Sequence, residues 1–214
     1  MVDGASATAA GRDWRVLVIC GASGVGKSQV SYPLARGYGV PLVEVDDIVE
    51  ALRAVTTPAQ LPLLHYWDTH PEAARLAPEE IVELQIALAE FLSPAIAAVI
   101  GNHLDTDTPV VVEGDFILPS LVVMETFAGL PAAGRVRGVV VTESSTDQLV
   151  ANYLRREPEA GAQAGRAAVS RLYGDWLAEQ AARHGVPCVS ARPWNDVLDR
   201  VRSVLDLDED HRSP

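Results

Sequence analysis

A run of glycines ends in a lysine and a serine near the start of the chain, and this spacing points to phosphate chemistry. Residues 21–28 fit the pattern G-x-x-x-x-G-K-[ST]. Glycines let successive backbone N–H groups point at one anion, Lys27 can reach the terminal phosphates of a nucleotide, and the Ser28 hydroxyl can ligate Mg²⁺. A glycine-rich turn that binds nothing is the weaker alternative, because an apolar strand precedes the loop and a helix follows it. The expected nucleotide-binding residues are Gly21, Ala22, Ser23, Gly24, Val25, Gly26, Lys27 and Ser28.

A pair of carboxylates follows the second apolar run. Residues 41–45 have the composition of a buried strand, and Asp46 and Asp47 come directly after it. In a doubly wound sheet the ligand lies at the carboxyl ends of the strands. We therefore predict that Asp46 orients or deprotonates an accepting hydroxyl and that Asp47 contacts the same substrate. Glu44 is an alternative partner in this task. An N-cap role for Asp46 on a helix over residues 48–54 is the structural alternative, and the two roles are compatible.

A second group of acidic residues follows the third apolar run. Residues 110–112 are all valine, and Glu113, Gly114 and Asp115 follow them. We predict that Glu113 holds magnesium through a bound water or acts as the base, and that Asp115 faces the acceptor. A solvated turn is the alternative for both, and it is weaker for Glu113 because that residue follows a wholly apolar strand. Whether Asp46 or Glu113 takes the proton is left open.

Four arginines fall within residues 155–171, among them Arg155, Arg156 and Arg166. Proline and glycine interrupt the helical pattern between them, which is typical of a mobile segment. Guanidinium groups grip phosphate oxygens in pairs of hydrogen bonds, and a segment that closes over a nucleotide excludes water. We predict an arginine-bearing lid in which Arg155 and Arg156 act on the transferred phosphate and Arg166 binds substrate. Ordinary salt bridges on a solvated helix are the alternative.

Two further regions are candidates for ligand contact. The loop after the last predicted strand carries Arg192 and Pro193, where a nucleotide base would be expected. Residues 48–102 are longer than one crossover helix needs, and we predict that they form a helical substrate-binding insertion. Its candidate substrate contacts are Trp67, His70 and Gln85. Two histidines and one carboxylate in its proline-rich loop are too few for a convincing metal site.

Five β-branched runs alternate with helical stretches, which predicts an α/β fold with a doubly wound parallel sheet of five strands. The predicted strands are residues 15–20, 41–45, 109–113, 136–142 and 186–190. The predicted helices are residues 27–36, closed by Gly37, and residues 79–100, 146–156, 167–183 and 194–205. Pro33 and Pro94 predict kinks in two of them. We expect one domain over residues 14–205, with flexible ends at 1–13 and 206–214.

The composition narrows the range of partners. A formal net charge of -12 over 214 residues opposes binding to nucleic acid, because that affinity comes from clustered lysine and arginine. The first residues lack the basic-then-apolar order of a secretion signal, and no run of about 18 apolar residues occurs. We expect a soluble, cytoplasmic protein with no membrane partner, and the oligomeric state is left open. Cys20 and Cys188 lie in apolar runs and are expected to be packing residues.

The order of these motifs resembles that of small P-loop kinases, and most nearly the 2-phosphoglycerate kinase group. The similarity covers residues 21–28, 39–48 and 110–114, with the following Pro119. The resemblance implies a three-layer α/β sandwich of the P-loop NTPase type. It also implies that Lys27 binds phosphate, Ser28 binds magnesium, and Asp46 and Glu113 act on the acceptor or on magnesium. Chloramphenicol phosphotransferase has a similar layout, with one aspartate after its second strand that Asp46 matches.

These observations predict an enzyme that moves the γ-phosphoryl group of Mg-ATP to a hydroxyl of a small metabolite or natural product. ATP is favoured over GTP because the sequence has no N-K-x-D guanine-binding motif. Residues 48–102 contain only two basic residues of the lysine and arginine type, Arg53 and Arg75, whereas a doubly anionic acceptor would need more positive charge. The alternative from another class is a nucleotide-binding ATPase or switch module that acts on a protein partner. A P-loop fold that has lost its activity is disfavoured because Lys27, Ser28, Asp46 and Glu113 are all present.

Overall fold

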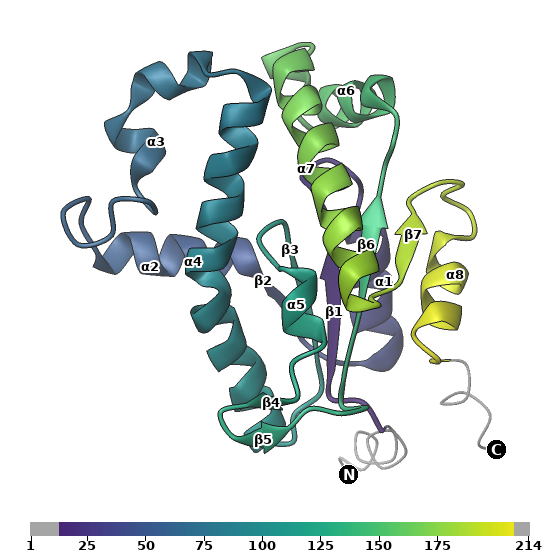
Figure 1. The fold of residues 1–214 in the computed structure, drawn as a ribbon. Coiled ribbons are helices and arrows are strands. Elements are labelled where there is room, and N and C mark those ends of the chain that lie inside the picture. The colour runs from purple at the N-terminus through teal and green to yellow at the C-terminus, as the bar shows by residue number, and fades with distance from the viewer. Residues whose placement is uncertain (1–12, 208–214) are drawn as a thin grey trace, which may run out of the picture.

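The structure is a computed structural model that describes residues 13–207 (Figure 1). Its main sheet has five parallel strands in the order β2-β3-β1-β6-β7. They are β1 (Val16–Cys20), β2 (Leu42–Glu44), β3 (Val110–Gly114), β6 (Val136–Thr142) and β7 (Cys188–Ser190). A separate antiparallel pair, β4 (Thr126–Phe127) and β5 (Leu130–Pro131), adds to the predicted elements. The predicted flexible ends, 1–13 and 206–214, fall almost wholly outside the described residues.

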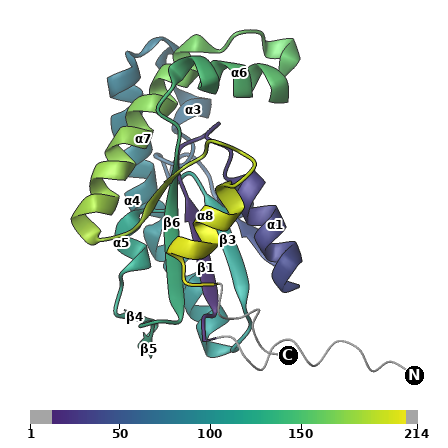
Figure 2. The ribbon, with the colours of Figure 1, turned by 90° about the vertical axis from the view of Figure 1, so that its right-hand side faces the viewer.

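Helices cover both faces of the main sheet. On one face α1 (Ser28–Tyr38) packs with α8 (Val197–Val204), and on the other lie α4 (Pro78–Asp105), α5 (Pro119–Val122) and α7 (Ala164–His184) (Figures 1 and 2). Three short elements, α2 (Val45–Val55), α3 (Tyr66–Thr69) and the 3₁₀ helix η1 (Pro71–Arg75), precede α4. After β6 come α6 (Thr146–Arg156) and the 3₁₀ helix η2 (Pro158–Ala160). Because both faces are covered, every residue of β1 is buried. The predicted α/β class with a five-stranded parallel sheet is confirmed.

The strand register brings the acidic residues to one edge of the sheet. Ile19 of β1 is in register with Glu113 of β3, and Glu113 is in register with Glu44 of β2. Since the three strands run parallel, the segments that follow them leave the sheet at the same edge. The phosphate loop, the first turn of α2 and Asp115 therefore lie close together.

The end of α1 differs from the predicted one. The helix continues through Gly37 to Tyr38 and ends at Gly39. Gly39 has a left-handed φ of 62°, and its N–H caps the last turn. Both α1 and α4 run on through their internal residues Pro33 and Pro94, and the predicted kinks stay predictions.

The boundary between β2 and α2 also differs. β2 stops at Glu44 and α2 begins at Val45, so Asp46 and Asp47 lie in the first turn of the helix. The N-cap position falls on Glu44, which contradicts the alternative of Asp46 as the cap. Carboxylates are common in the first turn of a helix, where the positive end of the helix dipole favours them.

The two cysteines differ in their surroundings. Cys20 is buried in β1, as predicted for a packing residue. Cys188 is exposed, which contradicts that prediction. The reason is its place at the start of β7, an edge strand of three residues that begins later than the sequence indicated.

The longest helix, α4, has 28 residues and exceeds its predicted length. An 18-residue window within it has a mean hydropathy of 1.7, which by length and composition alone would suit a membrane-crossing helix. In the fold α4 packs against α7, α2 and β1, and 33% of that window is buried. Packing against the sheet and its neighbours accounts for part of this apolar character.

Candidate active site

The phosphate loop joins the end of β1 at Cys20 to the start of α1 at Ser28. Two of its glycines, Gly24 and Gly26, have φ values of 77° and 96°, which L side chains rarely adopt. A Cβ at Gly24 would lie 2.8 Å from the Tyr153 ring, and a Cβ at Gly26 would collide with the ring of Trp194. The loop is thus packed closely against the rings of Tyr153 and Trp194, which lie far from it in the sequence.

Lys27 occupies the N-cap position of α1 and is 7% exposed. Its ammonium is ion-paired with Asp115 and donates a hydrogen bond of 3.2 Å to the carbonyl oxygen of Ala22. Burial by itself lowers the pKa of Lys27, but the carboxylates of Asp115, Glu113 and Asp46 outweigh it and raise that pKa above its usual value. Lys27 therefore stays charged at neutral pH. It is also the only lysine in the sequence.

Two of the predicted acidic residues have perturbed acidity. Burial, opposed by a hydrogen bond from the Ser31 hydroxyl, raises the pKa of Glu113. Partial burial and the neighbouring Asp115 raise the pKa of Asp46. Asp46 is an exposed residue, and within residues 13–207 its carboxylate has no hydrogen bond or ion pair. Raised carboxyl pKa values in one cavity are typical of sites that exchange protons.

Tyr32 and Glu44 add a second hydrogen-bonded pair beside these carboxylates. The Tyr32 hydroxyl donates to Glu44 at 2.5 Å, and this bond raises the pKa of Tyr32 to about 12. Tyr32 remains 52% exposed, so its ring is available to a ligand. Sequence reasoning named Glu44 as an alternative partner and missed Tyr32, which lies one turn of α1 beyond Ser28.

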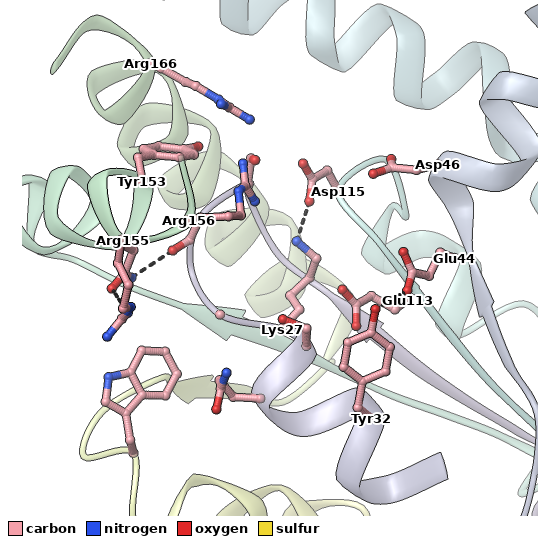
Figure 3. Close-up of a pocket in the computed structure, with 17 residues that line it drawn as sticks. Lys27, Tyr32, Glu44, Asp46, Glu113, Asp115, Tyr153, Arg155, Arg156 and Arg166 are labelled. Carbon is pink, nitrogen blue, oxygen red and sulfur yellow. Dashed lines mark hydrogen bonds and ion pairs between the residues drawn. The ribbon is translucent and has the colours of Figure 1, made fainter. Parts of the chain in front are cut away.

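The predicted lid arginines lie on the other side of Lys27 (Figure 3). Arg156 and Arg166 are ion-paired with Glu157 at 2.7 and 2.9 Å. The Arg166 guanidinium also lies 4.3 Å from the centre of the Tyr153 ring. These contacts connect the end of α6 with the start of α7.

Asn152 ties this helix to the phosphate loop. Its side-chain amide donates to the carbonyl oxygen of Gly24 at 2.9 Å, while Arg155 donates to the Asn152 oxygen at 2.8 Å. Asn152 is polar but buried, and these hydrogen bonds satisfy its side-chain amide. We infer that Asn152 holds α6 against the phosphate loop. Sequence reasoning missed it, and its spacing of three and four residues from the two lid arginines on one helix was the available signal.

A cavity of about 950 Å³ joins these groups. The predicted residues that line it are Ser23, Gly24, Gly26, Lys27, Ser28, Asp46, Glu113, Asp115, Arg155, Arg156 and Arg166. Glu44, predicted as an alternative, also lines it, and lining residues that were not predicted are Gln29, Tyr32, Asn152, Tyr153 and Trp194. Trp194 directly follows the predicted base-binding residues, so the sequence indicated the loop but not the aromatic residue in it.

Other predicted site residues do not line this cavity. They are Gly21, Ala22 and Val25 within the phosphate loop, and Asp47, Trp67, His70, Gln85, Arg192 and Pro193 elsewhere. Arg192 is ion-paired with Glu143 at 2.8 Å, and His70 stacks on Tyr66. From the predicted insertion 48–102 no residue reaches the cavity lining.

The site residues fit magnesium in the way that nucleotide-dependent enzymes hold it. Mg²⁺ in such enzymes keeps several waters and uses one or two protein oxygens together with the phosphates. Ser28 and Glu113 both line the cavity and could supply those oxygens. Within residues 13–207 no three His, Cys, Asp or Glu side chains are grouped as an all-protein metal site would require.

Comparison with known proteins places the fold. No protein-family model and no curated protein matches the chain. TT1252 from Thermus thermophilus is similar over 91% of this chain and 97% of its own, with 15% identity and a TM-score of 0.55. Shikimate kinase from Acinetobacter baumannii, in complex with shikimate, covers 97% and 100% at 12% identity and a TM-score of 0.48. Shikimate kinase from Aquifex aeolicus covers 91% and 98% at 14% identity and a TM-score of 0.47.

The parallel sheet and the phosphate loop define the class of this protein. The chain has a three-layer α/β fold with a five-stranded parallel sheet and a G-x-x-x-x-G-K-[ST] loop between β1 and α1, an arrangement typical of P-loop nucleotide-binding proteins. Identities this low describe the fold alone, and the 2-phosphoglycerate kinase group is not among the structures named above.

Proposed function

We propose that this protein is an ATP-dependent kinase that moves the γ-phosphoryl group of Mg-ATP to a hydroxyl of a small molecule. The observation that carries the proposal is one cavity of about 950 Å³ in which the phosphate loop, the buried Lys27 and the carboxylates of Asp46 and Glu113 meet. A loop of this kind binds phosphates, and a carboxylate beside it can orient a hydroxyl.

The chain's own residues suggest how the transfer proceeds. The backbone N–H groups of the phosphate loop hold the phosphates, and Lys27 exchanges Asp115 for the phosphate oxygens. Asp46 or Glu113 accepts the proton of the attacking hydroxyl, and the raised pKa of each makes it a better base than an ordinary carboxylate. Magnesium held by Ser28 and Glu113 would neutralise charge on the phosphates.

The remaining residues position the nucleotide and exclude water. Trp194 lies against Gly26 and is placed to contact the nucleotide beside the predicted base-binding loop of Arg192 and Pro193. Arg155 and Arg156 line the cavity, and in this proposal they bind the transferred phosphate once the lid moves toward it. In the transfer the bond from the γ-phosphorus to the β,γ-bridging oxygen breaks, and a bond from the acceptor oxygen to phosphorus forms.

The test is ATP consumption by the purified protein with Mg²⁺ and a panel of hydroxylated metabolites, nucleosides and antibiotics. We expect one compound class to stimulate ADP release, and we expect Asp46→Asn to lower this stimulation. Asp47→Asn is the matched control, since Asp47 is its neighbour in the same turn and does not line the cavity. Equal stimulation of the wild type and Asp46→Asn would contradict the role of Asp46.

A nucleotide-dependent module that acts on a protein is the second candidate. It is favoured by the exposed side chains of Trp67 and Phe91, each 39% accessible, and by the finding that no residue of the insertion 48–102 lines the cavity. ATP turnover that no small molecule in the panel stimulates would favour this candidate.

A further inference from the structure

The cavity has two walls of opposite charge, on either side of Lys27 (Figure 3). The arginine wall consists of Arg155, Arg156 and Arg166. The acidic wall consists of Tyr32, Glu44, Asp46, Glu113 and Asp115. Because the phosphate loop fixes where the phosphates end, the acceptor must lie beyond Lys27, against the acidic wall.

The arginine wall is already partly balanced. Arg156 and Arg166 share the carboxylate of Glu157, and Arg155 is held by Asn152. Within residues 13–207 none of the three forms an ion pair with a carboxylate of the acidic wall.

The acidic wall has a deficit of positive charge. Among the described residues, 13–207, its only ion pair with a basic side chain is that between Lys27 and Asp115. Glu113 and Glu44 accept hydrogen bonds from neutral hydroxyls, of Ser31 and Tyr32. Asp46 has no hydrogen bond or ion pair with any residue in 13–207.

Turnover would enlarge this deficit. When Lys27 binds phosphate, Asp115 loses its ammonium partner. Magnesium would balance Glu113, which leaves Glu44, Asp46 and Asp115 around the position of the acceptor. A carboxylate or phosphate on the acceptor would meet like charges there, whereas a protonated amine would find charge-assisted hydrogen-bond acceptors.

We propose that the acceptor is an amino alcohol, a compound with a protonated amine near the hydroxyl that receives the phosphoryl group, and that Glu44 determines this preference. The proposal rests on the kinase function above. During transfer the hydroxyl proton goes to Asp46 or Glu113, ADP leaves, and the ammonium keeps its proton and its charge. Glu44 suits the specificity role because it lines the cavity while its hydrogen bond comes from the neutral Tyr32.

The test uses two sets of related hydroxylated compounds, each with a cationic, a neutral and an anionic member. One set is glucosamine, glucose and glucuronate, and the other is 2-aminoethanol, ethylene glycol and glycolate. Binding to the full chain, loaded with magnesium and a non-hydrolysable ATP analogue, is measured by calorimetry, and ADP release with ATP is followed in parallel. We expect an amine to bind about tenfold more tightly than its neutral counterpart, and the acid to bind most weakly.

Two variants locate the effect. Glu44→Gln should reduce the preference for the amine by about tenfold, since the amide keeps the shape and the hydrogen bond from Tyr32 but loses the charge. Glu50→Gln is the matched control, because it removes the same charge from an exposed position of α2 outside the cavity. An unchanged preference in Glu44→Gln, or an equal loss in Glu50→Gln, would overturn the assignment of Glu44.

The outcomes separate this inference from the kinase function. Failure of both amines to bind, or equal or tighter binding of the neutral or acidic members, would overturn the amino-alcohol acceptor. ADP release stimulated by a neutral or acidic compound alone would keep the kinase function and overturn this inference. Amine-selective binding that depends on Glu44 but never stimulates ADP release would support the cationic ligand and contradict the kinase function.

Discussion

The ammonium of Lys27 and the carboxylate of Asp115 are ion-paired at the point where a phosphate-binding lysine would need to be free. The backbone of Asp115 is also held in place, because its carbonyl oxygen accepts a hydrogen bond of 3.1 Å from the Tyr173 hydroxyl on α7. The pair helps to keep Lys27 charged. In the proposed function the phosphates must compete with Asp115 for Lys27, and this contact couples nucleotide binding to the acidic wall.

Replacement of Asp115 by Asn should tighten nucleotide binding. The amide keeps the size of the side chain and removes the anion that competes with the phosphates. We expect the dissociation constant of Mg-ATP, measured by calorimetry, to fall by about threefold to tenfold. Asp68→Asn, on α3 outside the cavity, is the control. Weaker binding in Asp115→Asn would show instead that Asp115 positions Lys27 for the nucleotide.

Lys27 can be tested by chemistry as well as by mutation, because it is the only lysine in the chain. A nucleotide analogue that carries a lysine-reactive acyl phosphate should label Lys27, and excess ATP should prevent the labelling. Peptide mass spectrometry gives the site directly. Labelling confined to the N-terminal amine, or labelling that ATP does not reduce, would argue against phosphate binding by Lys27.

The pKa shifts predict a pH dependence of activity. The base must be deprotonated, and burial raises the pKa of both Asp46 and Glu113. The acid limb of kcat/KM should therefore lie above the pH at which an ordinary carboxyl group titrates. Asp46→Asn and Glu113→Gln should each lower kcat, and the variant that abolishes the acid limb identifies the base. An acid limb at the pH of an ordinary exposed carboxyl would contradict the role of both residues.

The same shifts predict a stability effect. A carboxyl group whose pKa is raised by folding binds its proton more tightly in the folded state. Its contribution favours folding below the unfolded pKa and is lost as pH rises through the folded pKa. Glu113→Gln should thus make the loss of unfolding free energy with rising pH shallower, as measured by urea denaturation across a pH series. An unchanged slope in this variant would contradict the raised pKa of Glu113.

Gly26→Ala should disrupt the phosphate loop. The added Cβ meets the Trp194 ring and forces an L side chain into a φ of 96°. We expect a loss of about 1–3 kcal/mol of unfolding free energy by thermal or urea denaturation, with loss of nucleotide binding. Gly165→Ala is the control, because that glycine lies in α7 with open space around it. It should stabilise the protein by about 0.5–1 kcal/mol. Equal effects of the two substitutions would contradict the packing of the loop described above.

Much of the fold was predictable because its signals are local. β1 is buried on both faces and apolar throughout, β3 begins with three buried valines, and the glycine pattern of the phosphate loop specifies its own flanking strand and helix. β7 was less well predicted, since an edge strand of three residues has little pattern of its own. Where β2 gives way to α2, the apolar run continues into the helix, and periodicity over so few residues could not locate the boundary.

The site was predicted where chemistry follows directly after a strand and missed where it depends on tertiary contact. Asp46, Glu113 and Asp115 fall at strand ends, and all three line the cavity. Asn152 and Trp194 reach the phosphate loop from segments more than a hundred residues away. Their neighbourhoods in the sequence mark a helix with two arginines and a loop after the last strand, but they do not predict the contact itself. The roles of all these residues stay predictions until they are tested.

Transfer of the γ-phosphoryl group to a small molecule can be followed directly with a labelled nucleotide. The protein is incubated with Mg-ATP labelled in the γ-phosphate and a small-molecule extract that includes amino alcohols, and the products are separated by chromatography. We predict that the label appears in a new organic phosphate, that ADP forms in equal amount, and that Lys27→Ala lowers both rates by at least about a hundredfold. Label found only in inorganic phosphate, or equal transfer by Lys27→Ala, would contradict the account.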